Sequence, residues 1–316
     1  RLSDAAANIP EFNYITDKRV FSEWQMFNNN TDWVKEVKQV GLRQNHFVSI
    51  TGGGEKATFR ISGGYDHETG SIIEQKLDRF TTRTMLDYYV SDRIKIMSDF
   101  SLTYTDNQRN SDDLLAIAYK KMPNLAIFEE DEQGNSLGRY YEMLKADDAL
   151  KDQRGLVNPI ASAKYAKNSY TTYAIDPKLE LQYDFLGIDD TKHRLTYNGE
   201  VIMNVFNAYE DTYYPRELST DNWNAGGVSK ATSYSSKSLA FTTTHTLTFV
   251  PHFLNEDHSF MTMGRFQLVS GTSSDQKTKV AGLPNGVEAP SAYSGDVQQL
   301  QSLEKSLLYV LCSLCL

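Results

Sequence analysis

The stretch RIKIMSDFSLTYT, residues 93–105, alternates between two kinds of side chain. Its even-numbered positions are mostly apolar and end in Tyr104, whereas its odd-numbered positions are mostly polar or charged. Because successive side chains of a β-strand point to opposite faces, this period of two predicts a strand with one apolar and one polar face.

The same alternation recurs along the chain and defines eight candidate strands in all. They lie at 44–51, 58–65, 79–88, 93–105, 173–185, 194–206, 239–250 and 260–268. Several have the roughly 9–11 residues that a tilted strand needs to cross a bilayer, and aromatic residues collect near their ends, as at membrane interfaces. The pattern therefore predicts an all-β fold, a transmembrane antiparallel β-barrel of which this chain supplies about eight strands. A large soluble β-sandwich is the alternative.

The predicted connections alternate in length. Short links lie at 52–55, 91–92, 187–192 and 251–257, and long links lie at 66–78, 106–169, 207–236 and after 270. Short periplasmic turns opposite long extracellular loops are typical of outer-membrane barrels. Two short helices are expected outside the strands, at 31–40 with Thr31 as its cap and at 112–122 with Ser111 as its cap.

Composition excludes several other classes of function. The formal net charge of −9 argues against a nucleic-acid partner, which needs a basic surface. The only two cysteines, Cys312 and Cys315, lie in an apolar tail that we expect to be truncated or aberrant. The six histidines show no metal-binding spacing, and no nucleophile motif is present. We therefore predict no enzymatic activity, no metal and no cofactor.

Two groups of side chains are candidates for function. Charged residues on the polar side of the predicted strands would be costly in lipid, so we expect them to face a lumen. They are Arg60, Arg83, Lys95, Asp99, Glu180, Asp184, Arg194, Glu200 and Arg265. Aromatic residues of the predicted long loops are candidates for contact with a substrate, although a girdle or loop-packing role is equally open. These are Tyr140, Tyr141, Tyr209, Tyr213, Tyr214 and Trp223.

Residues 31–107 resemble the first barrel strands of SusC/RagA-type TonB-dependent transporters. The resemblance rests on TDW at 31–33, Gly41, QNH at 44–46, the run SITGGGEKATFRISGGYDHETGSI at 49–72 and RFTTR at 79–83, all in the expected order. It implies an outer-membrane importer of glycans or oligopeptides in a Gram-negative, Bacteroidetes-like cell. It also implies a SusD-like surface lipoprotein and TonB as partners, with TonB acting through N-terminal parts not recognisable here.

The family's barrel has about twenty-two strands around a plugged lumen, so we expect this chain to be an early portion of it. The expected organisation is a plug-to-barrel linker with a short helix at 1–43, early barrel strands at 44–270, and an extracellular loop followed by the aberrant or truncated tail at 271–316. Two other functions remain open: a self-contained small outer-membrane barrel acting as anchor or adhesin, and a soluble secreted β-rich binding domain.

Overall fold

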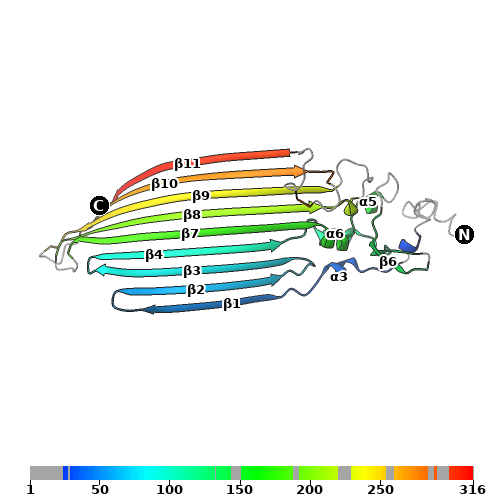
Figure 1. Ribbon diagram of the computed structural model, residues 1–316, viewed down its shortest axis with the longest axis horizontal. Helices are drawn as coiled ribbons and strands as arrows, with labels where there is room; N and C mark the ends of the chain where they lie inside the picture. Colours follow the sequence, from blue (N-terminus) through cyan, green and yellow to red (C-terminus); the bar gives the residue numbers. More distant parts are fainter. Residues whose placement is uncertain are drawn as a thin grey trace.

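The computed structural model describes residues 24–27, 29–131, 133–143, 151–187, 192–219, 229–253, 260–283, 288–289 and 299–315. Its main element is a nine-stranded sheet in which every strand pairs antiparallel with the next one along the chain (Figure 1). The strands are β1 (Arg43–Gly53), β2 (Ala57–Thr69), β3 (Lys76–Ser91), β4 (Ile94–Gln108), β7 (Lys167–Leu186), β8 (Arg194–Tyr214), β9 (Lys230–Val250), β10 (Thr262–Val280) and β11 (Gln299–Cys315). The edge strands β1 and β11 do not pair with each other, so the sheet is open, and the predicted antiparallel partial-barrel fold is confirmed.

The strands are longer than the sequence pattern predicted. β8 and β9 each have 21 residues. At about 3.4 Å per residue and a tilt of about 45°, such a strand rises about 50 Å, more than the roughly 30 Å of a hydrocarbon core. The extra length comes from serine-, threonine- and tyrosine-rich ends that continue the backbone ladder as far as the Tyr214–Lys230 pair. The expected loop at 207–236 therefore shortens to 215–229, and the one at 66–78 shortens to 70–75.

The region 271–316, expected to hold an extracellular loop and an aberrant or truncated tail, contains strand in the structure. β10 continues to Val280, and residues 299–315 form β11, which pairs with β10 from Met263–Cys315 to Lys279–Gln299. Residues 307–312 of this tail are apolar at almost every position and show no alternation, which is why the tail gave no strand signal. Its backbone groups are nevertheless paired along the whole length of the neighbouring strand.

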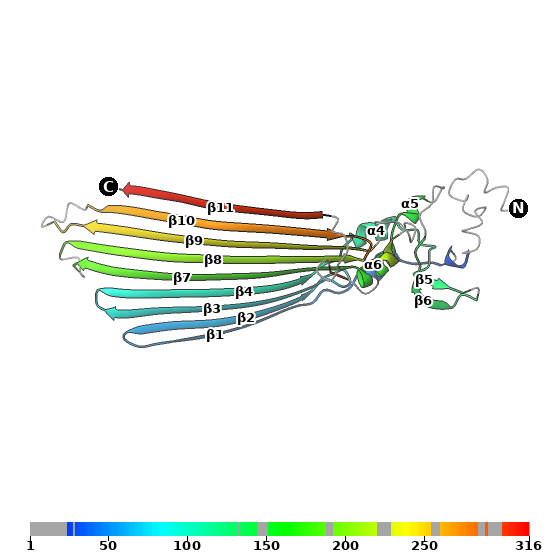
Figure 2. The ribbon, with the colours of Figure 1, turned by 45° about the horizontal axis from the view of Figure 1, so that its top comes forward.

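Short helices and one small hairpin gather at one end of the sheet, which we call the loop end (Figure 2). We call the opposite end the turn end; the strands are connected there by the links at 54–56, 92–93, 187–193 and 251–261. These elements are η2 (Trp24–Phe27), α3 (Trp33–Val37), α4 (Leu114–Lys120), β5 (Phe128–Glu130), β6 (Ser136–Tyr140), α5 (Lys151–Arg154), α6 (Pro159–Tyr165) and η3 (Arg216–Leu218). Both predicted helices exist but are shorter. Each is capped one or two residues later than expected, by Asp32 and Asp113, whose carboxylates accept backbone N–H bonds in the first turn.

The segment before β1 and the long insertion between β4 and β7 share one core, and we call residues 24–42 and 109–166 together the loop subdomain. Trp33 is 2% exposed and lies in this core with Val37, Leu114, Leu125 and other apolar residues. Its indole Nε1–H donates to the carbonyl of Met122 at 2.9 Å. Within the described residues, no helix is long and apolar enough to cross a membrane.

Candidate functional site: the two faces of the sheet

One face of the sheet is apolar from β2 to β11 and lies open to its surroundings. The register places Leu102, Ile175, Val205 and Leu239 directly opposite one another on this face of β4, β7, β8 and β9, and Ile61 lies on the same face of β2. Phe100 is 39% exposed and Leu179 is 54% exposed, although both lie in the middle of their strands. An exposed apolar surface that continues across several neighbouring strands marks an interaction with lipid or protein. We call it the apolar face.

Aromatic side chains border the apolar face towards the loop end. Tyr104, Tyr173 and Tyr209 follow one another on β4, β7 and β8, with ring centroids 5.0 Å and 6.3 Å apart. Tyr209 was predicted to lie in a loop, but the structure places it within β8 on this face. This position favours the girdle role that the sequence left open over contact with a substrate.

His245 lies within the apolar face, with both ring nitrogens in hydrogen-bond contact. Nδ1 is 2.6 Å from the hydroxyl of Tyr197, and Nε2 is 3.0 Å from the hydroxyl of Thr243. Gly199, which pairs with His245 across the strands, leaves room for the Tyr197 ring: a Cβ at this glycine would lie 2.7 Å from the tyrosine hydroxyl. The polar atoms of the histidine are thus satisfied within the sheet, as an apolar environment requires.

The opposite face, which we call the polar face, carries all nine charged residues predicted to face a lumen. This side carries the odd-numbered positions of β3, β4 and β10 and the even-numbered positions of β2, β7, β8 and β9. They place on one face Arg60, Arg83, Lys95, Asp99, Glu180, Asp184, Arg194, Glu200 and Arg265.

Most of the charges on the polar face are held by cross-strand partners. Arg83 Nε lies 2.9 Å from Asp99 Oδ1, and Lys95 Nζ lies 2.9 Å from Asp87 Oδ2. Asp184 accepts a hydrogen bond from the Thr196 hydroxyl at 2.7 Å. These pairs fix the side chains along the wall, so the polar face is an ordered surface on which few charges remain uncompensated.

Lys178 holds two carboxylates that would otherwise repel each other. Glu180 and Glu200 are a directly opposed cross-strand pair on β7 and β8. Lys178 Nζ contacts Glu180 Oε1 and lies 2.8 Å from Glu200 Oε2. Like charges at directly opposed positions destabilise a sheet, so the lysine offsets a repulsion that the register imposes.

We expect Lys178→Met to destabilise the sheet by about 1 kcal/mol, because it leaves Glu180 and Glu200 opposed without a cation. The measurement is the denaturant midpoint of the folded protein in detergent. The double variant Lys178→Met/Glu200→Gln should recover most of the loss, since only one carboxylate remains. An equal loss in both variants would contradict the account.

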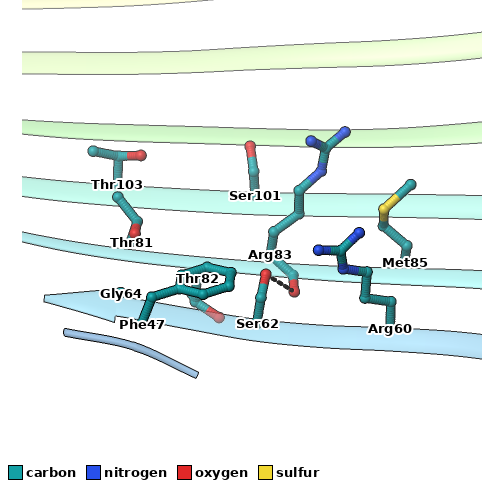
Figure 3. Close-up of a pocket in the computed structure, with 10 residues that line it drawn as sticks. All are labelled: Phe47, Arg60, Ser62, Gly64, Thr81, Thr82, Arg83, Met85, Ser101 and Thr103. Atoms are coloured by element: carbon teal, nitrogen blue, oxygen red, sulfur yellow. Dashed lines mark hydrogen bonds between the residues drawn. The ribbon is translucent and has the colours of Figure 1, made fainter. Parts of the chain in front are cut away.

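A hollow of about 380 Å³ opens on the polar face across β1 to β4 (Figure 3). The side chains of Phe47 and Met85 supply apolar walls, and Arg60 and Arg83 supply charge. Gly64 keeps the hollow open, because a Cβ at this position would lie 2.7 Å from Thr81 Oγ1. Both arginines were predicted from the sequence to face a lumen, whereas Phe47 and Gly64 were not among the candidate residues. The signal was the glycine pair at 63–64 inside a strand pattern, which indicates close approach by another group.

The predicted loop aromatics do not form one cluster. Tyr140 stacks on Phe128 with ring centroids 4.9 Å apart, whereas Tyr141 is 5% exposed in the core of the loop subdomain. Tyr213 packs against the small apolar cluster at the end of β9 and β10, and Tyr214 lies near Asp112. Trp223 lies outside the described residues. Packing therefore accounts for Tyr141 and Tyr213, and contact with a substrate stays a prediction for the group.

The loop subdomain contains a buried pair of opposite charges, Lys121 and Glu142. Lys121 Nζ donates to the carbonyl of Leu156 at 2.8 Å and lies 5.6 Å from the centroid of the Trp33 ring. Glu142 Oε1 accepts the backbone N–H of Asn158 at 2.8 Å, whereas Oε2 is buried without a hydrogen-bond partner. Burial lowers the pKa of Lys121 to about 8 and raises the pKa of Glu142 to about 7.

These shifts predict how the stability of the loop subdomain depends on pH. The pKa of Glu142 in the folded state is above its ordinary value of 4.5. Glu142 therefore contributes to the stability of the loop subdomain at acid pH, and this contribution is lost as the pH rises towards about 7. The folded pKa of Lys121 is below its ordinary value of 10.5, so stability returns as pH rises from about 8 upwards. Opening free energies from hydrogen exchange, corrected for intrinsic rates, should be lowest between about pH 7 and 8. Glu142→Gln should remove the fall in opening free energy between acid pH and about pH 7. If the pH dependence of the opening free energy is the same in this variant, Glu142 is not the group responsible.

No family model matches the chain. A TonB-dependent receptor P3 of Formosa agariphila is 25% identical over 169 residues, which cover 49% of this chain and 16% of that protein. The TonB-dependent receptor SusC of Bacteroides thetaiotaomicron is 21% identical over 182 residues, which cover 54% of this chain and 18% of that protein. The chain thus aligns with less than a fifth of the length of either relative.

Solved structures share the fold over nearly the whole chain. A structure of the RagAB peptide transporter matches 98% of this chain and 34% of that chain, with a TM-score of 0.61 and 14% identity. The RagAB peptide importer in its open-open state matches 99% of this chain and 34% of that chain, with a TM-score of 0.62 and 13% identity. The matched relatives are receptors and transporters, not enzymes. The aligned relatives and the shared fold both support the resemblance of residues 31–107 to SusC/RagA-type TonB-dependent transporters.

Proposed function

We propose that this chain forms part of the wall of an outer-membrane, TonB-dependent importer for glycans or oligopeptides. The observation that carries the proposal is the two-faced sheet. Its apolar face is continuous and open, and its opposite face carries a paired network of charges such as Arg83–Asp99 and Lys178–Glu200. A wall with lipid on one side and water on the other needs this division.

The position of the loop subdomain supports the same topology. In this proposal the loop end lies outside the cell and the turn end lies in the periplasm, as for other barrels with long outer loops. The girdle tyrosines, including Tyr104 and Tyr173, then mark the outer interface, and the strand ends beyond them stand in water. The partners are a SusD-like surface lipoprotein at the loop end and TonB from the periplasm. The chain carries out no covalent chemistry.

The test is uptake by cells of the producing organism, comparing the parent with a strain that carries an in-frame deletion of the region encoding residues 43–315. Labelled maltooligosaccharides and labelled tetra- to decapeptides are supplied at low concentration, with and without an uncoupler of the proton-motive force. We expect the deletion to abolish uptake of at least one class, and the uncoupler to abolish the same uptake in the parent. Unchanged uptake of both classes after the deletion would overturn the proposal. Uptake in the parent that continues at the same rate with the uncoupler would exclude coupling to TonB.

A further inference from the structure

The hollow on β1 to β4 contains two arginine side chains, and only one of them is neutralised by a carboxylate among the described residues. Arg83 is held by Asp99 through two contacts, Nε with Oδ1 and Nη2 with Oδ2. Arg60 has a different environment: its Nε donates to the Ser49 hydroxyl at 3.3 Å, and no ion pair joins it to a carboxylate among the residues that the structure describes. A guanidinium has five N–H donors in a planar fork, so most of the binding capacity of Arg60 is unused within this part of the chain.

The lining of the hollow suits a small group with a negative charge. Figure 3 shows the guanidinium groups of Arg60 and Arg83 between Ser101 and Met85, on the same side of the hollow. The hydroxyl group of Ser101 adds a further donor, whereas the Ser62 hydroxyl donates to the carbonyl of Arg83 at 3.4 Å. Gly64 lies beside Phe47 and Thr81, so its missing side chain leaves space at the end of the hollow that Phe47 lines.

We propose that this hollow binds a carboxylate, with Arg60 as the primary contact. A carboxylate matches the planar fork of an arginine in two parallel hydrogen bonds. Phe47 and Met85 would pack against the carbon atoms that carry it, which favours a carboxylate on a compact organic group over a free inorganic anion. The carboxylate has two possible sources: an acidic side chain of another segment of the same protein lying against the wall, or an acidic solute during import. This inference rests on the proposed topology, in which the polar face lines the lumen.

The test measures how fast phenylglyoxal modifies Arg60 in the full-length protein in native membranes, with peptide mass spectrometry as readout. Arg265 on β10 is the matched control, because it lies on the same face and has no ion pair to a carboxylate within the described residues. The acidic probes are trigalacturonate and acetyl-Ala-Glu-Ala-amide. The neutral probes are the methyl ester of trigalacturonate and acetyl-Ala-Gln-Ala-amide.

If the carboxylate comes from a solute, Arg60 and Arg265 react alike at rest, and an acidic probe slows only Arg60 while its neutral counterpart does not. Arg60→Gln should then weaken binding of that probe roughly tenfold or more, because the two charge-assisted hydrogen bonds of the guanidinium are lost, and Arg60→Lys should lose less. If the carboxylate belongs to the protein, Arg60 is slow at rest, and Arg60→Gln lowers the thermal midpoint whereas Arg265→Gln does not.

The inference is overturned if Arg60 reacts as fast as Arg265 and no acidic probe slows it, or if neutral probes protect equally. It is also overturned if Arg60 is slow at rest but Arg60→Gln leaves the thermal midpoint unchanged, because simple crowding then explains the protection. None of these readouts depends on uptake, so the carboxylate site can fail while the importer proposal stands.

Discussion

Phe100→Arg should prevent most of the protein from reaching the folded state in the outer membrane. Phe100 lies in the middle of β4 on the apolar face and is 39% exposed. If that face contacts acyl chains, a guanidinium at mid-depth costs about 2–4 kcal/mol. The measurement is the fraction of protein recovered from outer-membrane fractions in the heat-modifiable, folded form.

Met97→Arg is the matched control for this substitution. Met97 lies three residues away on the same strand but on the polar face, between Asp87 and Glu180 of the neighbouring strands. An arginine there meets two carboxylates and water, so we expect near-normal recovery. Equal losses for Phe100→Arg and Met97→Arg would indicate that both faces of the sheet are packed against protein.

Trp33→Ala should open the loop subdomain while leaving the strands in place. Trp33 is 2% exposed, and it joins the segment before β1 to the β4–β7 insertion through its packing and its hydrogen bond to Met122. Truncating a buried tryptophan to alanine costs about 3–5 kcal/mol, a large share of what a small core can supply. Hydrogen exchange at residues 109–131 should accelerate accordingly, with β7 and β8 unaffected.

Tyr119→Ala serves as the control, because Tyr119 lies on α4 in the same subdomain but is 68% exposed. We expect its removal to change exchange in the insertion by a small amount only. If Trp33→Ala and Tyr119→Ala have the same small effect, the segment before β1 does not support the insertion in the membrane-bound protein.

Local alternation was sufficient to predict the eight strands from β1 to β10 that belong to the sheet, and the face that each charged residue occupies. It was sufficient because a strand with lipid or core on one side must alternate. β11 gave no such signal, since residues 307–312 are apolar at almost every position. The strand ends were also missed, because segments such as 231–237 are polar on both sides and look like loop. Backbone pairing with a longer neighbour, which no local pattern reveals, extends them.

The packing of the loop subdomain and the hollow could not be predicted from sequence patterns, for a different reason. The contact between Trp33 and Met122 joins residues 89 positions apart, one at the start of α3 and one just past the end of α4, and local periodicity gives no information about such a contact. The hollow depends on the cross-strand register that brings Phe47 beside Gly64 and Thr81. Charged positions could be identified singly from the sequence. Only the three-dimensional structure shows which of them form ion pairs. Arg83 is paired with Asp99, whereas Arg60 has no ion pair to a carboxylate among the described residues.

The most direct test asks whether alternate side chains of β4 contact acyl chains. Single cysteines are introduced on the apolar face at Ile96, Phe100 and Leu102, and on the polar face at Met97, Ser101 and Thr103, after Cys312 and Cys315 are replaced by serine. Each is labelled with a nitroxide in native membranes, and collision rates with oxygen and with a water-soluble nickel complex are measured. We predict that the first three labels favour oxygen and the last three favour nickel, in strict alternation. Labels on the apolar face that are shielded from both reagents would mean that this face is packed against protein, and would contradict the account.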